Sequence, residues 1–276
     1  MTDSVNDNTI HARSEPLEVS DRQPYVDIHC HCLAALDDGP ATMSDSIALC
    51  RKMVEDGIAV AVATPHLFGG FKDWNEAAKV REAVCLLNET LKNDGVPLNV
   101  LAGSEVHVDE RLCRFLEDGR IMTLADGGRY ILLELPFQVS VDITPLLTEL
   151  ASVGVQCIIS HVERIAPFAA RRRTLLTWID HCAHLQITAS SLTGDFGRRV
   201  QSLAWSFLES GWAKLVATDS HDLDHRRPRM RAAFDRVATR LGKDVAHMVC
   251  IENPSRVVSG QDILPVSLHD QQGAQR

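Results

Sequence analysis

The chain has 276 residues, of which 45% are hydrophobic and 24% are charged, and its formal net charge is −9. This composition is typical of a soluble globular protein with a sizeable core. The acidic balance excludes general nucleic-acid binding and a basic membrane-surface role, and no apolar run reaches about 18 residues, so we expect no membrane insertion.

Short apolar runs alternate with amphipathic segments along most of the chain. The runs predict seven strands, at about residues 25–29, 58–63, 98–102, 129–133, 155–159, 185–189 and 213–218. Helices are expected at about residues 44–56, 74–93, 109–117, 142–153, 170–182, 196–210, 229–241 and 244–250, followed by a last short helix. Strands that are continuous apolar runs favour an α/β domain whose parallel sheet is covered by helices, open or closed into a barrel.

The helix caps and the polar ends bound this domain. Ser44 is expected to cap the first helix, and Asn253, which precedes a proline, is expected to cap the last. The folded domain is expected to span residues 24–262. Residues 1–23 and 263–276 are expected to be flexible tails, and the first of them lacks the apolar core of a secretory signal.

Eight cysteines are spread along the chain, at positions 30, 32, 50, 85, 113, 157, 182 and 250. None forms a CxxC pair, and most lie in apolar patterns, so we expect reduced, buried thiols in a cytoplasmic protein. A cysteine-nucleophile phosphatase needs an arginine six residues after the cysteine. Cys157 and Cys182 lack that partner, we expect that no other cysteine has it, and we therefore expect no cysteine nucleophile.

The first strand runs into two histidines, in the segment V-D-I-H-C-H. His29 and His31 point to the same side under the two-residue period of a strand, while the cysteines that alternate with them point away. Two co-facial imidazoles can chelate one divalent ion, although a lone HxH is as often a pair of ordinary histidines. Asp37 and Asp38 follow in a turn within reach of the same place.

Side chains that can ligate a metal ion also follow the carboxyl ends of later strands: His66, Glu105, Glu134, His161, Asp219 and His221. The carboxyl ends of parallel barrel strands open onto one face, where barrel enzymes hold their sites. This set exceeds the need of a single ion, and mixed nitrogen and oxygen ligands suit Mn, Fe, Zn or Mg. The pattern predicts two or three ions, which would generate hydroxide near neutral pH and hold both oxygens of an in-line displacement.

Two arginines, Arg164 and Arg226, closely follow two of these histidines. A guanidinium group suits the bidentate binding of phosphate oxygens, so both arginines are candidates for contacts with a phosphoryl group. Each taken alone is as often part of a surface salt bridge. Arg227 and Arg229 compete with Arg226 for the same role.

Eight motifs occur in order between about residues 25 and 258: D-I-H-C-H with D-D-G-P, T-P-H, G-S-E, L-L-E-L, S-H-V-E-R, and T-D-S-H followed by R-R-P. This ordered set resembles the PHP-family bacterial protein-tyrosine phosphatases that accompany capsule and exopolysaccharide synthesis clusters. The resemblance implies a distorted (β/α)7 TIM-like barrel with a trinuclear metal site, usually manganese-dependent.

The resemblance also implies the role of each site residue. One ion would be held by His29, His31, Glu105 and Asp219. A second would share Glu105 and be held also by Glu134 and His161, and a third would be held by Asp38, His66 and His221. Asp38 is preferred over Asp37 because it directly precedes Gly-Pro. Arg164 and Arg226 would grip the phosphoryl group, although the family typically carries R-P-P where this chain has R-R-P.

The reaction that the resemblance implies is hydrolysis of phosphotyrosine on a protein, a bacterial tyrosine kinase of polysaccharide export, by hydroxide attack on phosphorus. Three alternatives stay open. A related phosphoesterase would cleave a small molecule such as histidinol phosphate. A metal-dependent amidohydrolase normally has a lysine at a middle strand end, where this chain has Glu134. A non-catalytic module would bind phosphotyrosine without cleaving it.

Overall fold

The computed structural model describes residues 23–68, 75–165 and 171–267, so residues 1–22 of the predicted tail, residues 1–23, lie outside these ranges. The described ranges hold nine strands: β1 (Tyr25–Cys30), β2 (Ile58–Ala63), β3 (His66–Leu67), β4 (Asn99–Ala102), β5 (Glu105–His107), β6 (Tyr130–Glu134), β7 (Gln156–Ile159), β8 (His184–Thr188) and β9 (Ala213–Ala217). They form two parallel sheets, in the orders β1-β2-β4 and β3-β5-β6-β7-β8-β9. The predicted α/β class with parallel strands is confirmed.

Two short strands, β3 and β5, were not predicted, and each follows a predicted strand after a break of two residues. Pro65 separates β2 from β3, because proline has no N–H to donate to the ladder. Gly103 separates β4 from β5, and a Cβ built on it would lie 2.7 Å from Cγ1 of Val62, so the close backbone approach requires glycine. These two added strands belong to the other sheet, and each carries a predicted site residue, His66 on β3 and Glu105 on β5.

The predicted helices are present with shifted ends, and the predicted starts at residues 74 and 170 lie outside the described residues. The longer helices are α1 (Met43–Glu55), α2 (Ala77–Asn93), α3 (Leu112–Glu117), α4 (Thr144–Ser152), α6 (Arg172–Asp180), α8 (Arg198–Glu209) and α9 (Met230–Leu241). Shorter helical segments are η1 (Leu124–Asp126), η2 (Val162–Arg164), α7 (Ala189–Thr193), α10 (Lys243–His247), η3 (Met248–Glu252) and α11 (Asn253–Val258). Of these, η1, η2 and α7 were not predicted, and α7 begins where the sixth strand was expected to end.

Two predicted helix caps are wrong. The N-cap of α1 is Thr42 rather than Ser44, because Thr42 and Asp45 form a capping box in which each side chain accepts the other's backbone N–H. Asn253 lies inside a run of helical turns from α10 through η3 to α11 and has a helical φ of −63°. Its side chain instead accepts the backbone N–H of Leu264 at 2.9 Å.

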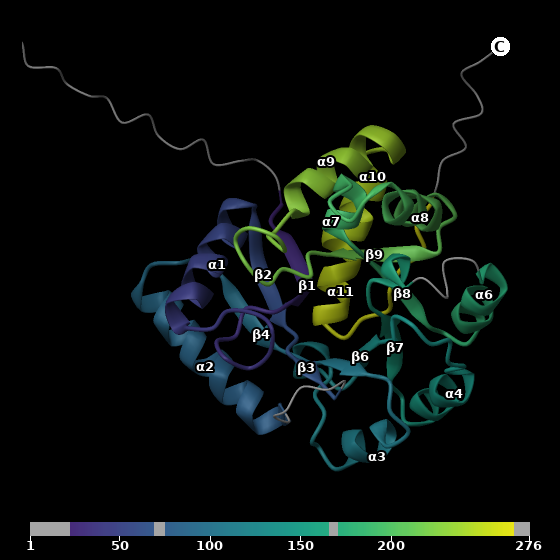
Figure 1. The fold of residues 1–276 in the computed structure, drawn as a ribbon, viewed down its shortest axis with the longest axis horizontal. Helices are drawn as coiled ribbons and strands as arrows, with labels where there is room; N and C mark the ends of the chain where they lie inside the picture. The colour runs from purple at the N-terminus through teal and green to yellow at the C-terminus, as the bar shows by residue number, and fades with distance from the viewer. Residues whose placement is uncertain (1–22, 69–74, 166–170, 268–276) are drawn as a thin grey trace, which may run out of the picture.

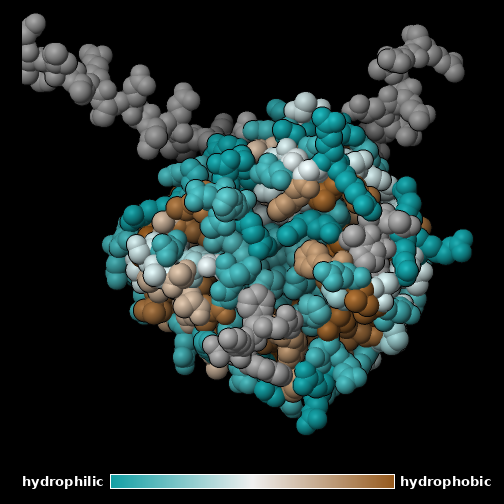
Figure 2. Space-filling view, in the orientation of Figure 1, coloured by the Kyte–Doolittle hydropathy of each residue, from teal (hydrophilic) through white to brown (hydrophobic). Residues whose placement is uncertain are grey.

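Most of the longer helices lie outside the strands, whereas α11 lies near the centre of the view in Figure 1, in contact with β1 and β9. Figure 1 shows α1 and α2 beside β2 and β4, and α4 beside β7. Hydrophilic residues cover most of the face turned to the viewer, including its centre (Figure 2). None of the helices in the described ranges is long and apolar enough to cross a membrane.

Two buried apolar clusters form the core. The larger one packs helix residues such as Leu49 and Leu87 against strand residues such as Ile131. The smaller one is built mainly from strand residues, among them Ile28 and Leu132. Because side chains alternate across a strand, the strands bury both of their faces, as their continuous apolar runs predicted.

The predicted C-terminal tail begins later than residue 263. Ile263 is buried in the smaller cluster, and the side chain of Val266 packs against the larger one. The contacts of these two apolar residues with the core hold the segment in place, although its polar composition predicted a tail. Residues 268–276 lie outside the described residues.

The cysteines follow the prediction only in part. All eight lie within the described ranges and have free thiols, but Cys85 and Cys182 are exposed rather than buried. Cys30 and Cys32 belong to the larger apolar cluster, so they do point away from the histidines that alternate with them.

The last strand returns to the first. The backbone N–H of Asp219, just after β9, donates to the carbonyl of His29 in β1 at 2.8 Å. Two residues earlier in β1, the fully buried Asp27 accepts hydrogen bonds from the backbone N–H of Thr218, at 2.9 Å, and from the Thr218 hydroxyl. Burial raises the pKa of Asp27 to about 6, against the effect of these hydrogen bonds. The contacts hold an edge of each sheet together beneath the predicted site.

Candidate metal centre

All nine residues predicted to ligate metal lie at the carboxyl ends of the parallel strands. They are His29 in β1, His31 and Asp38 after it, His66 in β3, Glu105 in β5, Glu134 at the end of β6, His161 after β7, and Asp219 and His221 after β9. They form four overlapping groups, and within each group the possible ligand atoms lie within 4.8 Å of one another. Parallel strands deliver them to one face, which brings together residues far apart in the sequence.

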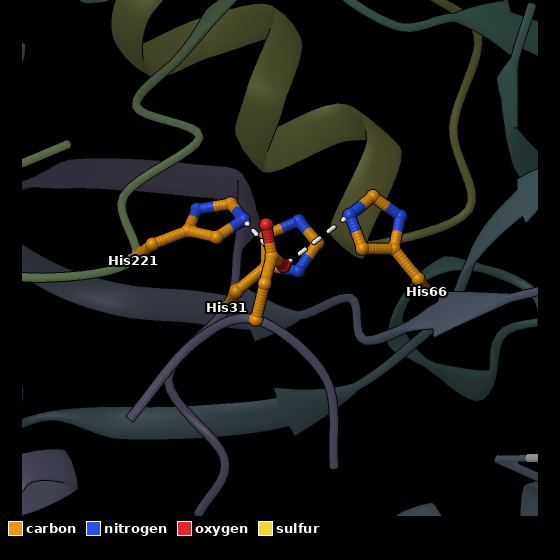
Figure 3. A group of neighbouring side chains, drawn as sticks. His31, His66 and His221 are labelled. Atoms are coloured by element: carbon orange, nitrogen blue, oxygen red, sulfur yellow. Dashed lines mark ion pairs between the residues drawn. The ribbon is translucent and has the colours of Figure 1, made fainter. Parts of the chain in front are cut away.

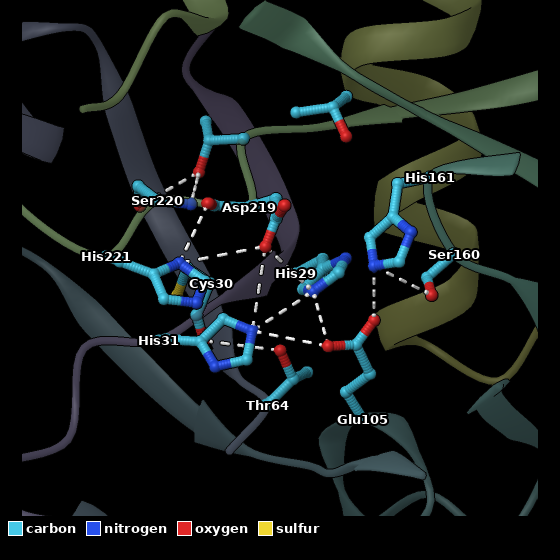
Figure 4. Close-up of polar contacts among 12 residues, drawn as sticks. His29, Cys30, His31, Thr64, Glu105, Ser160, His161, Asp219, Ser220 and His221 are labelled. Atoms are coloured by element: carbon cyan, nitrogen blue, oxygen red, sulfur yellow. Dashed lines mark hydrogen bonds and ion pairs between the residues drawn. The ribbon is translucent and has the colours of Figure 1, made fainter. Parts of the chain in front are cut away.

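The two histidines of β1 face the same point as Asp219. Nε2 of His29 lies 3.2 Å from Nε2 of His31 and 3.3 Å from Oδ1 of Asp219 (Figure 4). All three side chains are buried. The alternation of the first strand therefore placed both imidazoles as predicted.

Glu105 lies at the middle of the cluster. Its Oε1 is 3.0 Å from Nε2 of His161, and its Oε2 is 3.3 Å from Nε2 of His29 and 3.1 Å from Nδ1 of His66 (Figure 4 shows the first two contacts). Glu134 approaches the same Nδ1 of His66 at 3.4 Å. The Glu105 carboxylate is fully buried, and neither oxygen has a hydrogen-bond partner. A carboxylate so placed needs cations around it.

Asp38 forms the solvent side of the cluster. Its Oδ1 lies 3.1 Å from Nε2 of His221 and 3.5 Å from Nε2 of His66, and His31 lies between these two rings (Figure 3). The imidazoles of His31 and His221 stack with their centroids 3.8 Å apart. The Asp38 side chain is 45% exposed, whereas the three imidazoles are nearly buried. Substrate can therefore reach this group from solvent.

The carboxylates raise the pKa values of imidazoles that they face. Burial alone would lower the pKa of His29, but Glu105 and Asp219 raise it to about 9. Burial would likewise lower the pKa of His66, and the carboxylates of Asp38, Glu134 and Glu105 raise it to about 11. In the absence of an ion, protons on His29 and His66 balance the neighbouring carboxylates.

The residues present fit bound divalent ions. Metal bonds of about 2.1 Å place neighbouring ligand atoms about 3.0–3.4 Å apart in octahedral or tetrahedral geometry. The contacts among His29, His31, Glu105 and Asp219 are between 3.2 and 3.7 Å. Together with the unpartnered oxygens of Glu105, this spacing suits ions with mixed nitrogen and oxygen ligands.

Two side chains behind the cluster orient its histidines. Asp37 Oδ2 lies 2.6 Å from Nδ1 of His31, and Gln186 Oε1 lies 3.0 Å from Nδ1 of His29. Such partners hold an imidazole so that its other nitrogen faces a metal. Asp37 is thus a supporting residue rather than a member of the four groups. Gln186 was missed in the sequence, although a polar amide inside the apolar strand Leu185–Ala189 was a signal.

Two residues of the cluster adopt strained backbone conformations. His161 has a φ of 30° and Asp219 a φ of 53°. Residues other than glycine rarely adopt the left-handed region, and such conformations persist where surrounding structure enforces them, often at functional sites. Both residues directly follow a strand, so the turn in the backbone aims their side chains into the cluster.

Both predicted arginines reach the cluster. Arg164 Nη1 contacts Oδ2 of Asp219, and Arg226 Nη2 lies 2.7 Å from Oδ1 of the same carboxylate. Arg226 Nη1 also lies 3.2 Å from Asp38 Oδ2. Arg229 instead pairs with a carboxylate outside the cluster. The geometry therefore favours Arg226 over Arg229 for the role that the sequence left open.

One cysteine does have an arginine six residues later, which the sequence interpretation overlooked: Cys250 and Arg256. Cys250 is fully buried in helical turns, and burial raises the pKa of its thiol. Arg256 forms an ion pair with Glu252 at 3.3 Å on the same helical run. A buried, protonated thiol is inert, so the expectation of no cysteine nucleophile stands on burial rather than on spacing.

The fold and this cluster define a class of protein, a parallel α/β domain with a histidine- and carboxylate-rich candidate metal centre at its strand ends. The family model described as "Capsular polysaccharide synthesis, CpsB/CapC" matches residues 25–259. The chain therefore belongs to the CpsB/CapC family, and the resemblance seen in its motifs is confirmed.

Curated relatives match over nearly their whole length. Tyrosine-protein phosphatase YwqE of Bacillus subtilis (strain 168) is 33% identical over 239 residues, which cover 86% of this chain and 93% of the relative. Tyrosine-protein phosphatase CpsB of Streptococcus pneumoniae is 28% identical over 242 residues, which cover 86% and 99%.

Comparison with solved structures also supports membership of this family. A structure from a study of YwqE and CpsB, described as unique metal-dependent tyrosine phosphatases, matches with a TM-score of 0.83 and 32% identity over 87% of this chain and 96% of that chain. The phosphotriesterase homology protein of Escherichia coli matches with a TM-score of 0.54 and 11% identity over 84% of this chain and 98% of that chain, a likeness of fold alone.

Proposed function

We propose that the protein is a metal-dependent tyrosine-protein phosphatase, which hydrolyses phosphotyrosine on a protein substrate. Nine residues with nitrogen or oxygen ligand atoms and two arginines converge at the carboxyl ends of the strands, here called the rim, and this convergence carries the proposal. The names of relatives that match over most of their length support it. The enzyme is then a phosphoric monoester hydrolase linked to capsule synthesis, as its family description indicates.

The fold itself is proposed to be a distorted (β/α)7 TIM-like barrel of the PHP type. When β2 with β3 and β4 with β5 each count as one barrel strand, the pairings join seven barrel strands in their order along the chain. The backbone N–H of His31, just after β1, donates to the carbonyl of Ser220, just after β9, at 2.8 Å. This contact supports closure of the last barrel strand against the first.

The proposed cofactor is two or three Mn²⁺ ions, with Fe, Zn or Mg as alternatives. The first ion would be held by His29, His31, Glu105 and Asp219. The second would be held by Glu105, Glu134 and His161, and the third by Asp38, His66 and His221. When bound, such ions lower the pKa of water and neutralise charge on the phosphate.

The chain's own residues bind and orient the phosphoryl group. The side chains of Arg164 and Arg226 are 18% and 24% exposed, so their guanidinium groups can exchange contacts with Asp219 for phosphoryl oxygens. Gln186 and Asp37 hold the imidazoles in place behind them. The phenol of tyrosine has a pKa of about 10 and leaves more readily than a serine alkoxide.

We also propose a cytoplasmic location and a bacterial tyrosine kinase of polysaccharide export as the physiological partner. The free thiols of all eight cysteines support a reducing compartment. The capsule-synthesis description of the family supports the kinase. The net charge of −9 argues against nucleic acid as a partner.

Comparison of two substrates tests the proposed function. With the manganese-loaded protein, we expect kcat/KM for a phosphotyrosine peptide to exceed that for histidinol phosphate by about 100-fold. The reason is that the Asp38 side of the cluster is exposed to solvent, whereas a site for a small molecule would be enclosed. Phosphate release measures both rates. The reverse preference would make the protein a small-molecule phosphoesterase, and binding of the peptide without phosphate release would make it a non-catalytic module.

Metal binding is expected to release protons. At pH 7 the metal-free protein holds protons on His29 and His66, whose pKa values are raised to about 9 and about 11, and an ion must displace them. We expect about one or two protons released per chain at pH 7 and tighter Mn²⁺ binding as the pH rises toward 9. Calorimetric titration in buffers of different ionisation enthalpy measures the release, and a value of zero would contradict the ligand assignment.

A further inference from the structure

An exposed phenyl ring lies beside the candidate metal centre. Phe137 is in the loop that follows β6, and 42% of its surface is exposed. Its ring stacks on that of His161, with centroids 5.5 Å apart and an interplanar angle of 20°. Because Nε2 of His161 lies 3.0 Å from Glu105, only one imidazole separates the phenyl ring from the middle of the cluster.

The same ring borders one of the two arginines. Cζ of Arg164 lies 5.8 Å from the centroid of Phe137 and 4.5 Å from that of Phe196. The guanidinium of Arg164 also contacts Asp219. A phosphoryl group that contacts both Arg164 and the centre therefore lies next to Phe137.

The exposure of this ring calls for a reason other than packing. Single exposed apolar residues are ordinary, and Val139 in the same loop is 59% exposed. Phe137 differs because its ring is ordered by contacts on two cluster residues while its remaining surface faces solvent. An aromatic surface held at the edge of an ionic site is suited to contact an apolar part of the substrate.

We propose that Phe137 is a specificity-determining residue that stacks against the aromatic ring of an aryl phosphomonoester. The proposal rests on the proposed function. In phosphotyrosine a single ester oxygen separates phosphorus from the tyrosine ring. When the phosphoryl group is bound at the centre, the tyrosine ring therefore lies within reach of Phe137. Aromatic pairs interact at centroid separations of about 4.5–7 Å. An alkyl phosphate offers no such ring.

Phosphonates test this without a leaving group. Calorimetry with the manganese-loaded protein gives dissociation constants for phenylphosphonate and methylphosphonate. In Phe137→Ala, we expect the constant for phenylphosphonate to rise about fivefold to tenfold and that for methylphosphonate to change less than about twofold. Phe137→Tyr should bind both as the wild type does. Val139→Ala, from the same loop, is the matched control and should change neither.

The outcomes separate the two proposals. An equal loss of affinity for both phosphonates in Phe137→Ala, or no loss for phenylphosphonate, would overturn the role of Phe137 while leaving the phosphatase activity in place. If wild type instead prefers histidinol phosphate to phosphotyrosine peptide, the proposed function fails, whatever the phosphonates show. Thermal unfolding of each variant verifies that its fold is retained.

Discussion

Dialysis against EDTA is expected to lower kcat for phosphotyrosine hydrolysis by about 1,000-fold or more, and added Mn²⁺ is expected to restore it. The reason is the donor set, in which the Glu105 carboxylate is fully buried without a hydrogen-bond partner and faces imidazole nitrogens at 3.0 to 3.3 Å. Without ions, nothing on the rim generates hydroxide near neutral pH. Phosphate release from a phosphotyrosine peptide measures the rate, and elemental analysis measures the metal content.

The same samples provide the control. Since ions bind the folded chain, depletion is expected to lower the melting temperature as well as the rate, and both are expected to recover together on reloading. Reloading in parallel with Mn²⁺, Fe²⁺, Zn²⁺ and Mg²⁺ identifies the preferred ion. Full activity in metal-depleted protein with EDTA still present would rule out a metal-dependent mechanism.

Removal of either arginine is expected to lower kcat/KM by about 100- to 1,000-fold while the bound metal content stays unchanged. In Arg164→Ala and Arg226→Ala, the Asp219 carboxylate loses one guanidinium partner but keeps its place 3.3 Å from His29. The phosphoryl group, in contrast, loses a guanidinium group that would neutralise the charge on its equatorial oxygens. Steady-state kinetics with a phosphotyrosine peptide measures the effect.

Arg229→Ala is the matched control, because Arg229 pairs outside the cluster, and we expect its kcat/KM to be unchanged. Arg164→Lys keeps the charge but not the bidentate geometry and is expected to recover activity only in part. A normal kcat/KM in both alanine variants would remove the arginines from the mechanism. Loss of metal in parallel with activity would instead mean that they only support the centre.

The positions of the site residues were largely readable from the chain. His29 and His31 share one side of a strand, and His66 and Glu105 directly follow apolar runs. Because parallel strands present their carboxyl ends on one face, order along the sequence was enough to predict convergence. The residues that support the site were not readable in this way, since Gln186 acts on His29 from 157 positions away.

Local chemistry also limited what could be predicted about the fold. The short strands β3 and β5 lie beyond the breaks at Pro65 and Gly103, where the predicted strands had already ended, and their pairing depends on the neighbouring strands. The cap of α1 depends on a reciprocal bond between Thr42 and Asp45, and several polar residues nearby could have formed it. Such choices are decided by which geometry the surrounding packing allows.

The sequence by itself determined the parallel α/β class, the family and the set of nine candidate ligands, because periodicity and strand-end position are local properties of the chain. Only the tertiary structure decided that Asp37 supports His31 from behind, and that Arg226 rather than Arg229 reaches Asp219. These choices depend on distances of a few ångströms between segments far apart in the sequence. Closure of β9 onto β1 and backbone strain set those distances, and neither has a signature in the order of residues.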